Sequence, residues 1–169
     1  MLDVDLNRLR REGRARIDAD IPPDSEFWGD LEVEPASPLA VRLEAQQAGP
    51  DVVVRGRVAG EFALDCRRCL EPVTVGIEEE LGRLYRVGED QAAEESEDVL
   101  ALPPGTELDL RDPVRETVLL AVPRYAYCRE ECRGLCPKCG TNLNEATCEC
   151  TVDEVDERWA PLRRLKSEG

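Results

Sequence analysis

The sequence contains no histidine, and aromatic residues make up only 4% of its 169 residues. Without histidine, a zinc shell of the usual cysteine and histidine type must be all sulfur. With so few aromatic side chains, the hydrophobic core must rest mainly on Val, Leu, Ile and Ala, and we expect it to be small. Bound metal would stabilise such a fold, because binding to folded thiolates adds directly to the free energy of unfolding.

Long apolar segments are also missing. No stretch approaches the roughly 18 apolar residues of a membrane-spanning helix. The N-terminus runs from Met1 into a group of arginines and lacks the apolar centre of a signal peptide. We therefore expect a cytoplasmic protein with no membrane partner. In a reducing cytosol, cysteines grouped in pairs more often bind metal than form disulfides.

Positive charge is scarce and local. The formal net charge is −15, of which residues 1–123 carry −14 and residues 124–169 only −1. Such an overall field repels phosphate, so any contact with RNA must come from local basic clusters. Solvated charges that balance an acidic surface are the simpler interpretation of these clusters. The candidate RNA or partner contacts are Arg8, Arg10, Arg11, Arg14, Arg16, Arg133, Lys138, Arg158, Arg163, Arg164 and Lys166.

The apolar pattern predicts an α+β fold, with an antiparallel β-sheet or half-barrel and flanking helices. Residues 3–13 are expected to form a short basic helix that Asp3 or Asp5 caps and Gly13 ends. Residues 14–36 contain three prolines, which favour an extended path along the surface.

From residue 39 the apolar period changes to two. This alternation predicts strands that begin near residues 39, 52 and 73, with the last continuing to about residue 85. Residues 88–98 are so acidic and so poor in apolar side chains that we expect a disordered loop. A helix is predicted to begin at Asp109 or Asp112, with Pro113 in its first turn, and to stop at Pro123.

The expected organisation has two parts. Residues 1–123 form an antiparallel-sheet domain that includes the N-terminal basic helix and the acidic loop 88–98. Residues 124–169 form an all-cysteine, zinc-ribbon-like module followed by a C-terminal helix over 153–166.

Eight cysteines supply the clearest chemical signal. They occur as two CxxC pairs, one CxxxC pair and one CxC pair. Structural zinc takes four tetrahedral ligands, and short spacings allow one turn to direct two sulfurs at one ion. Eight thiols therefore predict two zinc sites with four cysteine ligands each. The expected ligands are Cys66, Cys69, Cys128, Cys132, Cys136, Cys139, Cys148 and Cys150.

Two groupings of these ligands are open. In the first, the last four cysteines close a local site, and the first CxxC pair joins Cys128 and Cys132. In the second, the four cysteines from Cys128 to Cys139 share one ion, and the first pair joins Cys148 and Cys150. Closing a short local loop costs less entropy, which favours the first grouping. Spacing alone does not separate zinc from an iron–sulfur cluster.

Several stretches resemble the YceD family of bacteria and plastids. They are Cys66-Arg-Arg-Cys69, the run CREECRGLCPKCGTNLN over 128–144, residues 108–123, the pair Cys148-Glu-Cys150 and the stretch 156–162. The resemblance covers most of the chain from about residue 50 onward. It implies a factor needed for the accumulation of large-subunit (23S) ribosomal RNA. One departure is Asp156-Glu157-Arg158-Trp159, where family members often read Asp-Pro-Arg-Phe. Some relatives lack the second cysteine cluster, which implies that the shared function does not require it.

These observations predict a non-catalytic zinc-binding factor in large-subunit ribosome biogenesis. It would support 23S rRNA accumulation or processing by binding precursor rRNA, a ribosomal protein or both, without a small-molecule substrate. The alternative is a thiol redox enzyme or a metal-dependent RNA-processing enzyme. A redox CxxC normally opens a helix, and catalytic zinc needs an open ligand position. Neither feature is visible in the sequence. A transcription-type zinc ribbon would leave the long preceding sheet unexplained.

Overall fold

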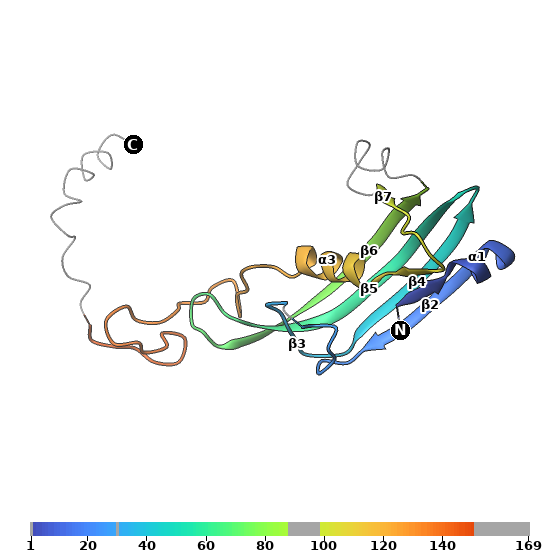
Figure 1. Cartoon of the computed structure of the whole chain (residues 1–169). Coiled ribbons are helices and arrows are strands. Elements are labelled where there is room, and N and C mark those ends of the chain that lie inside the picture. The colour runs from blue at the N-terminus through green and yellow to red at the C-terminus, as the bar shows by residue number, and fades with distance from the viewer. Residues whose placement is uncertain (1, 30, 88–98, 151–169) are drawn as a thin grey trace, which may run out of the picture.

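A curved, mostly antiparallel sheet dominates the computed structural model, which describes residues 2–29, 31–87 and 99–150 (Figure 1). Its strands lie in the order β2–β4–β5–β6–β7, with β3 beside β5. Every pair is antiparallel except β6 with β7, which is parallel. The strands are β2 (Arg14–Ile21), β3 (Glu34–Pro35), β4 (Leu39–Ala48), β5 (Asp51–Asp65), β6 (Pro72–Arg86) and β7 (Val99–Ala101).

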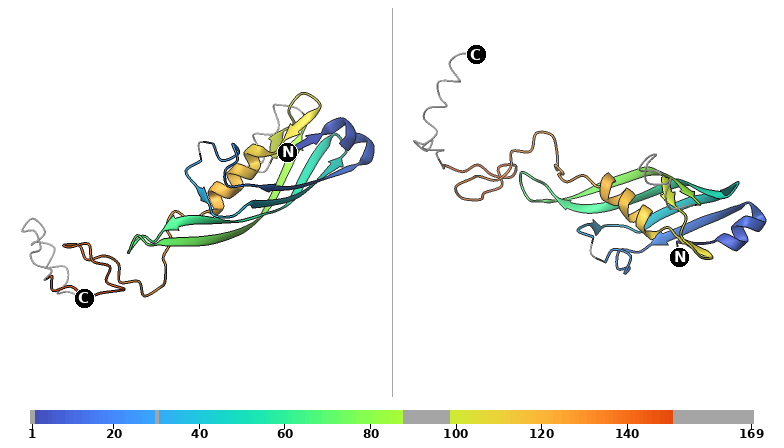
Figure 2. Two further views of the ribbon diagram at one scale, coloured as in Figure 1. Left: turned by 90° about the horizontal axis from the view of Figure 1, so that it is seen from below. Right: turned by 45° about the horizontal axis from the view of Figure 1, so that its top comes forward.

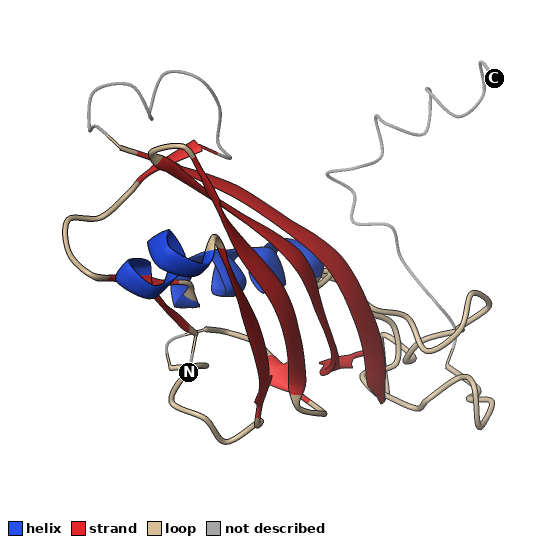
Figure 3. Cartoon of the chain, turned by 90° about the vertical axis from the view of Figure 1, so that its right-hand side faces the viewer, coloured by secondary structure: helices blue, strands red, loops and turns tan. Residues whose placement is uncertain are grey.

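Two helices and a small second sheet complete the described fold. Strand β1 (Asp3–Asp5) pairs with β8 (Glu107–Asp109). The helices are α1 (Leu6–Glu12) and α3 (Arg111–Ala121). In Figures 2 and 3 both helices lie on the same side of the large sheet. The predicted α+β architecture, an antiparallel sheet with flanking helices, is confirmed.

Alternation along the strands explains why one face of the sheet is covered. Leu39, Val41 and Leu43 on β4 are buried, while Arg42 between them is exposed. Cross-strand registers extend the same face, as in the pairing of Val41 with Val58. Side chains two residues apart share a face of a strand, so the strands bury one apolar surface under the helices.

Local signals set the ends of helix α1 as predicted. The Asp5 carboxylate accepts a hydrogen bond from the Arg8 amide (2.9 Å), and Gly13 takes a left-handed conformation (φ 77°) at the C-terminus. Leu6 and Leu9 form the buried face. The helix is shorter than the predicted 3–13, because residues 3–5 pair with β8 instead.

Helix α3 begins near the predicted position. Asp109 accepts a hydrogen bond from the Arg111 amide (2.8 Å), and Pro113 occupies the first turn. Val114 and Val118 are buried against the sheet. The apolar spacing of this segment therefore correctly predicted which face of the helix packs against the sheet.

Residues 14–21 follow the expected extended path, but the sequence did not predict that they form a strand. They form β2, an edge strand that pairs with β4 along its whole length. Ile17 and Ile21 are buried, and Trp28 packs edge-on against Phe62 with ring centroids 5.8 Å apart. The sequence does not predict this strand, because its charged residues alternate with alanine and isoleucine and only every fourth side chain is both large and apolar.

The cysteine-rich segment follows α3 and lies beyond the β5–β6 turn, at the opposite end of the sheet from α1 (Figure 1). The predicted helix 153–166 and the acidic loop 88–98 lie outside the described residues. The boundary between residues 123 and 124 stays a prediction. None of the helices in the described ranges is long and apolar enough to cross a membrane.

Candidate metal centre

Two segments distant in sequence form the first group of four thiols. Cys66 and Cys69 lie in the turn between β5 and β6, and Cys128 and Cys132 lie in the segment after α3. The Sγ atoms of Cys66 and Cys132 are 3.8 Å apart, and those of Cys69 and Cys128 are 3.6 Å apart. Four sulfurs at about 2.3 Å from a zinc ion lie about 3.8 Å from one another in a tetrahedron. These distances fit a zinc shell of four cysteine sulfurs.

Backbone hydrogen bonds join these segments. The Cys66 amide donates to the Glu71 carbonyl (2.8 Å), which closes the turn. The Arg67 amide donates to the Ala126 carbonyl (2.9 Å), and Cys66 forms a parallel bridge with Ala126. The thiols are therefore placed by paired backbone rather than by flexible side chains.

Polar side chains hold the segments around the first cluster in place, and one of them donates a hydrogen bond to a ligand sulfur. Asn144 donates from Nδ2 to the Cys132 sulfur (3.3 Å), and its Oδ1 accepts from the Arg133 amide (2.8 Å). Arg68 donates to the carbonyls of Glu130 (3.0 Å) and Cys132 (3.1 Å). Partners of this kind fix the orientation of ligands and tune their basicity.

The second group of thiols is local and more exposed. Its members are Cys136, Cys139, Cys148 and Cys150, whose sulfurs lie within 4.8 Å of one another. The Cys136 amide donates to the Thr141 carbonyl (2.8 Å). Gly140 has φ 73° and donates its amide to the Cys136 carbonyl (2.9 Å). Residues 136–140 therefore form a tight turn that directs two sulfurs at one point, as the short cysteine spacing predicts, and glycine adopts its left-handed conformation without strain.

Hydrogen bonds and desolvation together give the thiols of each cluster different pKa values. The pKa of Cys66 is lowered to about 6, mainly by a hydrogen bond from the Cys128 backbone. The pKa of Cys139 is lowered to about 6, mainly by its hydrogen bond with the Thr141 hydroxyl. Burial raises the pKa of Cys128 to about 12. Low-pKa thiols favour metal binding, because the thiolate is the ligand.

The structure groups the eight thiols in the first of the two ways considered. The bridge between Cys66 and Ala126 brings Cys128 to the first CxxC pair, which leaves Cys148 and Cys150 for the local cluster. Each group offers four sulfurs, which is the number that closes a tetrahedral structural zinc shell.

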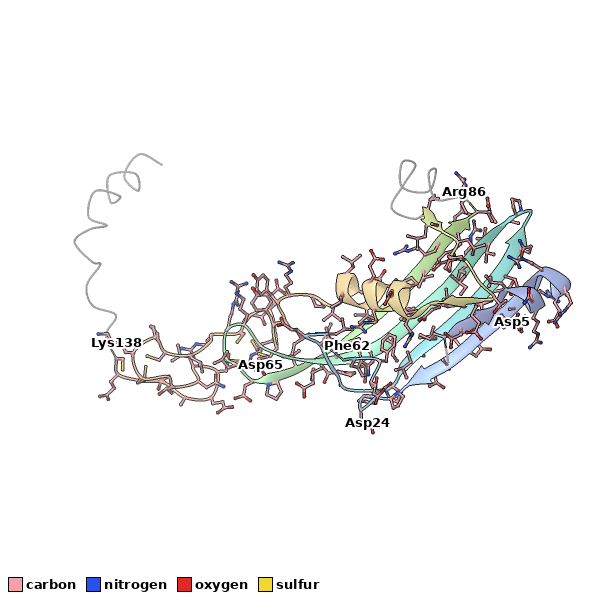
Figure 4. All side chains as sticks on the ribbon, viewed as in Figure 1. Asp5, Asp24, Phe62, Asp65, Arg86 and Lys138 are labelled. Atoms are coloured by element: carbon pink, nitrogen blue, oxygen red, sulfur yellow. The ribbon has the colours of Figure 1, made fainter. Side chains whose placement is uncertain are left out.

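The basic candidates do not form one surface. Arg8, Arg10 and Arg11 lie on α1, and Arg14 and Arg16 lie on β2. All five are exposed and lie at the far end of the molecule from the cysteines, where Figure 4 labels Asp5. Arg133 and Lys138 are exposed beside the cysteines. Arg158, Arg163, Arg164 and Lys166 lie outside the described residues.

Sequence reasoning missed two arginine–tyrosine stacks at the first cluster. The Arg67 guanidinium carbon lies 3.6 Å from the centre of the Tyr125 ring, and that of Arg68 lies 5.0 Å from the Tyr127 ring. The alternation of Tyr125, Ala126 and Tyr127 just before the cysteines was the available signal, because it is typical of an extended segment with one face outward.

Comparison with known proteins identifies relatives over most of the chain. The sequence profile of the family described as "Large ribosomal RNA subunit accumulation protein YceD" matches residues 54–166. An uncharacterized protein of Mycobacterium tuberculosis is 30% identical over 166 residues, which cover 95% of this chain and 79% of the relative. No solved structure matches the chain significantly.

Plant relatives have a more informative name. A protein of Arabidopsis thaliana named "Large ribosomal RNA subunit accumulation protein YCED homolog 1, chloroplastic" is 38% identical over 73 residues. This match covers 43% of this chain and 23% of the relative. A protein of the same name from Zea mays is 27% identical over 159 residues, which cover 77% of this chain and 54% of the relative.

Proposed function

The chain belongs to the YceD family, and from that premise we propose that it is a non-catalytic zinc-binding factor in large-subunit ribosome biogenesis. It supports the accumulation or processing of 23S rRNA by binding precursor rRNA or a ribosomal protein. Its zinc is structural, in two sites of four cysteines each. The protein works in the cytoplasm.

The observation that carries this proposal is the position of the cysteines within the family match. The matched residues 54–166 contain all eight cysteines, including the pair in the β5–β6 turn. The family name refers to rRNA accumulation, and the matched region contains both thiol clusters together with β6, α3 and most of β5. Metal binding and the rRNA function are therefore expected in the same part of the molecule.

Two features favour binding over catalysis. The first CxxC pair lies in a turn between two strands, whereas a redox CxxC normally opens a helix. Each cluster offers four sulfurs, which fill a zinc shell and leave no position for water or substrate. The sulfur-only donor set also suits an iron–sulfur cluster, so the identity of the metal is part of the proposal.

The test combines metal content with rRNA levels. The full chain is purified without added metal as wild type, Cys66→Ser and Cys136→Ser, and its metals are measured by mass spectrometry. We expect two zinc ions per wild-type chain and about one in each variant. Glu149→Gln is the matched control, since it alters a residue between two ligands and removes no sulfur.

The same variants are expressed in a bacterium from which its own YceD-family gene has been deleted. We expect the wild type and Glu149→Gln to restore the ratio of large- to small-subunit rRNA, and Cys66→Ser to fail. Iron in place of zinc would overturn the metal assignment. Reversible disulfide formation without any bound metal, or normal rRNA levels in the deletion strain, would overturn the proposed function.

A further inference from the structure

Two of the few aromatic side chains are held outward beside the first cysteine cluster. Tyr125 is 57% exposed and Tyr127 is 49% exposed, while Trp28, Phe62 and Tyr85 are buried. Leaving large rings in water forgoes the stabilisation that their burial would supply. This exposure points to a surface that a partner covers.

The backbone at the cluster turns both rings the same way. Ala126 between them is buried and forms the bridge to Cys66. Side chains alternate along an extended segment, so Tyr125 and Tyr127 project together, away from Ala126. The cluster therefore fixes the two rings relative to each other.

Arginines from the β5–β6 turn complete this surface. Arg67 stacks on Tyr125 and Arg68 on Tyr127, at the distances given above. Hydrogen bonds to the carbonyls of Glu130 and Cys132 hold Arg68 in place. No side-chain hydrogen bond of Arg67 is found among the described residues, so its guanidinium can donate to a ligand. These four residues, Arg67, Arg68, Tyr125 and Tyr127, are called the arginine–tyrosine platform.

The cysteine-rich segment beside these four residues is much less acidic than the rest of the chain. Residues 124–150 carry four Lys/Arg and four Asp/Glu, whereas residues 1–123 have a net charge of −14. Exposed Arg124 comes just before Tyr125, and exposed Arg129 and Arg133 follow Tyr127 in sequence. Phosphates are repelled by the acidic body and meet arginines here.

We propose that the arginine–tyrosine platform binds unpaired RNA, with bases stacked on the tyrosine–arginine planes and phosphates paired with guanidinium groups. Planar side chains of this kind recognise single-stranded bases, since every base has a face that can stack. Tyrosine and arginine are also common in protein–protein hot spots, but those lie in well-packed, desolvated pockets. Here both tyrosines are exposed and each has an arginine beside its ring, which favours a nucleic acid. This inference rests on the proposed function and names the partner class of the same region.

Fluorescence anisotropy tests the proposal with the zinc-loaded full chain. The probes are a dye-labelled single-stranded RNA of mixed sequence and the same strand annealed to its complement. We expect tighter binding to the single strand. The double substitution of Tyr125→Ala with Tyr127→Ala should weaken that binding about a hundredfold, since each of the two base stacks contributes about tenfold.

Two further variants separate stacking from charge and fold. The double change of Tyr125→Phe with Tyr127→Phe keeps both rings, so its affinity should stay within about twofold of the wild type. Arg67→Lys keeps the charge but loses the planar guanidinium, and should weaken binding. Zinc content shows that each variant retains its clusters.

Equal affinity of the wild type and the double alanine variant for the single strand would overturn the platform. So would a preference for duplex, or binding of a ribosomal protein, rather than RNA, that depends on the two tyrosines. If the double alanine variant restores 23S rRNA in the deletion strain and binds RNA normally, this inference fails while the proposed function stands. A wild-type chain that fails to restore 23S rRNA would instead overturn the proposed function.

Discussion

At the scale of single residues, hydrogen bonds give two exposed thiols of one cluster different pKa values. Cys139 and Cys150 belong to the same cluster, and both are exposed. The Thr141 hydroxyl lies 3.1 Å from the Cys139 sulfur and lowers the pKa of that thiol to about 6. The hydrogen bond with Cys139 raises the pKa of Cys150 to about 12. Hydrogen bonding, rather than exposure class, therefore accounts for the difference between the two pKa values.

This difference predicts selective alkylation in zinc-free, reduced protein. A thiol is a thiolate above its pKa, so between about pH 6 and pH 12 Cys139 is deprotonated while Cys150 is not. At pH 7, iodoacetamide should modify Cys139 well before Cys150, as followed by peptide mass spectrometry. Lowering the pH through about 6 should protonate Cys139 and abolish the selectivity.

Thr141→Val provides the matched variant for this measurement. It removes the hydroxyl, so the pKa of Cys139 should rise and its alkylation at pH 7 should slow. Loading with zinc should protect both cysteines. Similar rates for Cys139 and Cys150 in the zinc-free wild type would contradict the assignment.

At the scale of elements, strand β5 pairs with β3, β4 and β6, and its close approach to β4 depends on a glycine in the strand. Gly56 pairs with Leu43 on β4 and Leu81 on β6. A Cβ atom on Gly56 would overlap the Arg42 carbonyl oxygen and lie 2.7 Å from the Leu43 Cα. The close approach of β4 and β5 therefore requires a residue without a side chain.

Gly56→Ala should destabilise the protein because the backbone of β4 must move to admit the methyl group. We expect a loss of about 2 kcal/mol or more in the free energy of unfolding, measured by urea denaturation of zinc-loaded protein. Gly76→Ala is the control. Gly76 lies on the neighbouring strand β6, and a Cβ atom there would meet nothing within 4 Å. Its effect should stay within about 1 kcal/mol. Equal effects of the two changes would contradict the steric argument.

At the scale of the whole molecule, two separate buried clusters hold the described structure. The larger one joins the sheet to α1 and α3. The smaller one consists of Cys66, Cys69 and Cys132, against which Val73 and Leu135 pack. So few apolar side chains bury little surface, and under the proposed function bound metal would supply most of the stability at that end.

Removal of zinc with a chelator should therefore loosen one end of the protein and spare the other. In hydrogen-exchange mass spectrometry, peptides covering 126–144 should lose protection, while peptides from β4 should keep theirs. Restoring zinc should reverse the change. Simultaneous loss of protection in β4 would contradict this picture and indicate one cooperative unit.

Much of this protein was predictable because its local signals and its tertiary contacts agree. The alternation from residue 39 predicted three strands, and the structure places β4, β5 and β6 there. Asp5 and Gly13 predicted the ends of α1. Loop-closure entropy favoured the correct grouping of the cysteines. Each of these rests on residues near one another in sequence, or on a ligand number that chemistry imposes.

The remaining features depend on which segments meet. Strand β2 forms because it pairs with β4, and the parallel strand β7 forms because it pairs with β6. The sequences of these two segments alone do not predict strands. The arginine–tyrosine platform exists because the bridge between Cys66 and Ala126 places a turn beside a segment some sixty residues away. Sequence alone determined the sulfur chemistry, the main strands and the acidic charge of this protein. Only the tertiary structure decided which side chains lie beside the cysteine sulfurs, because contacts between segments far apart in the chain produce no periodic pattern in the sequence.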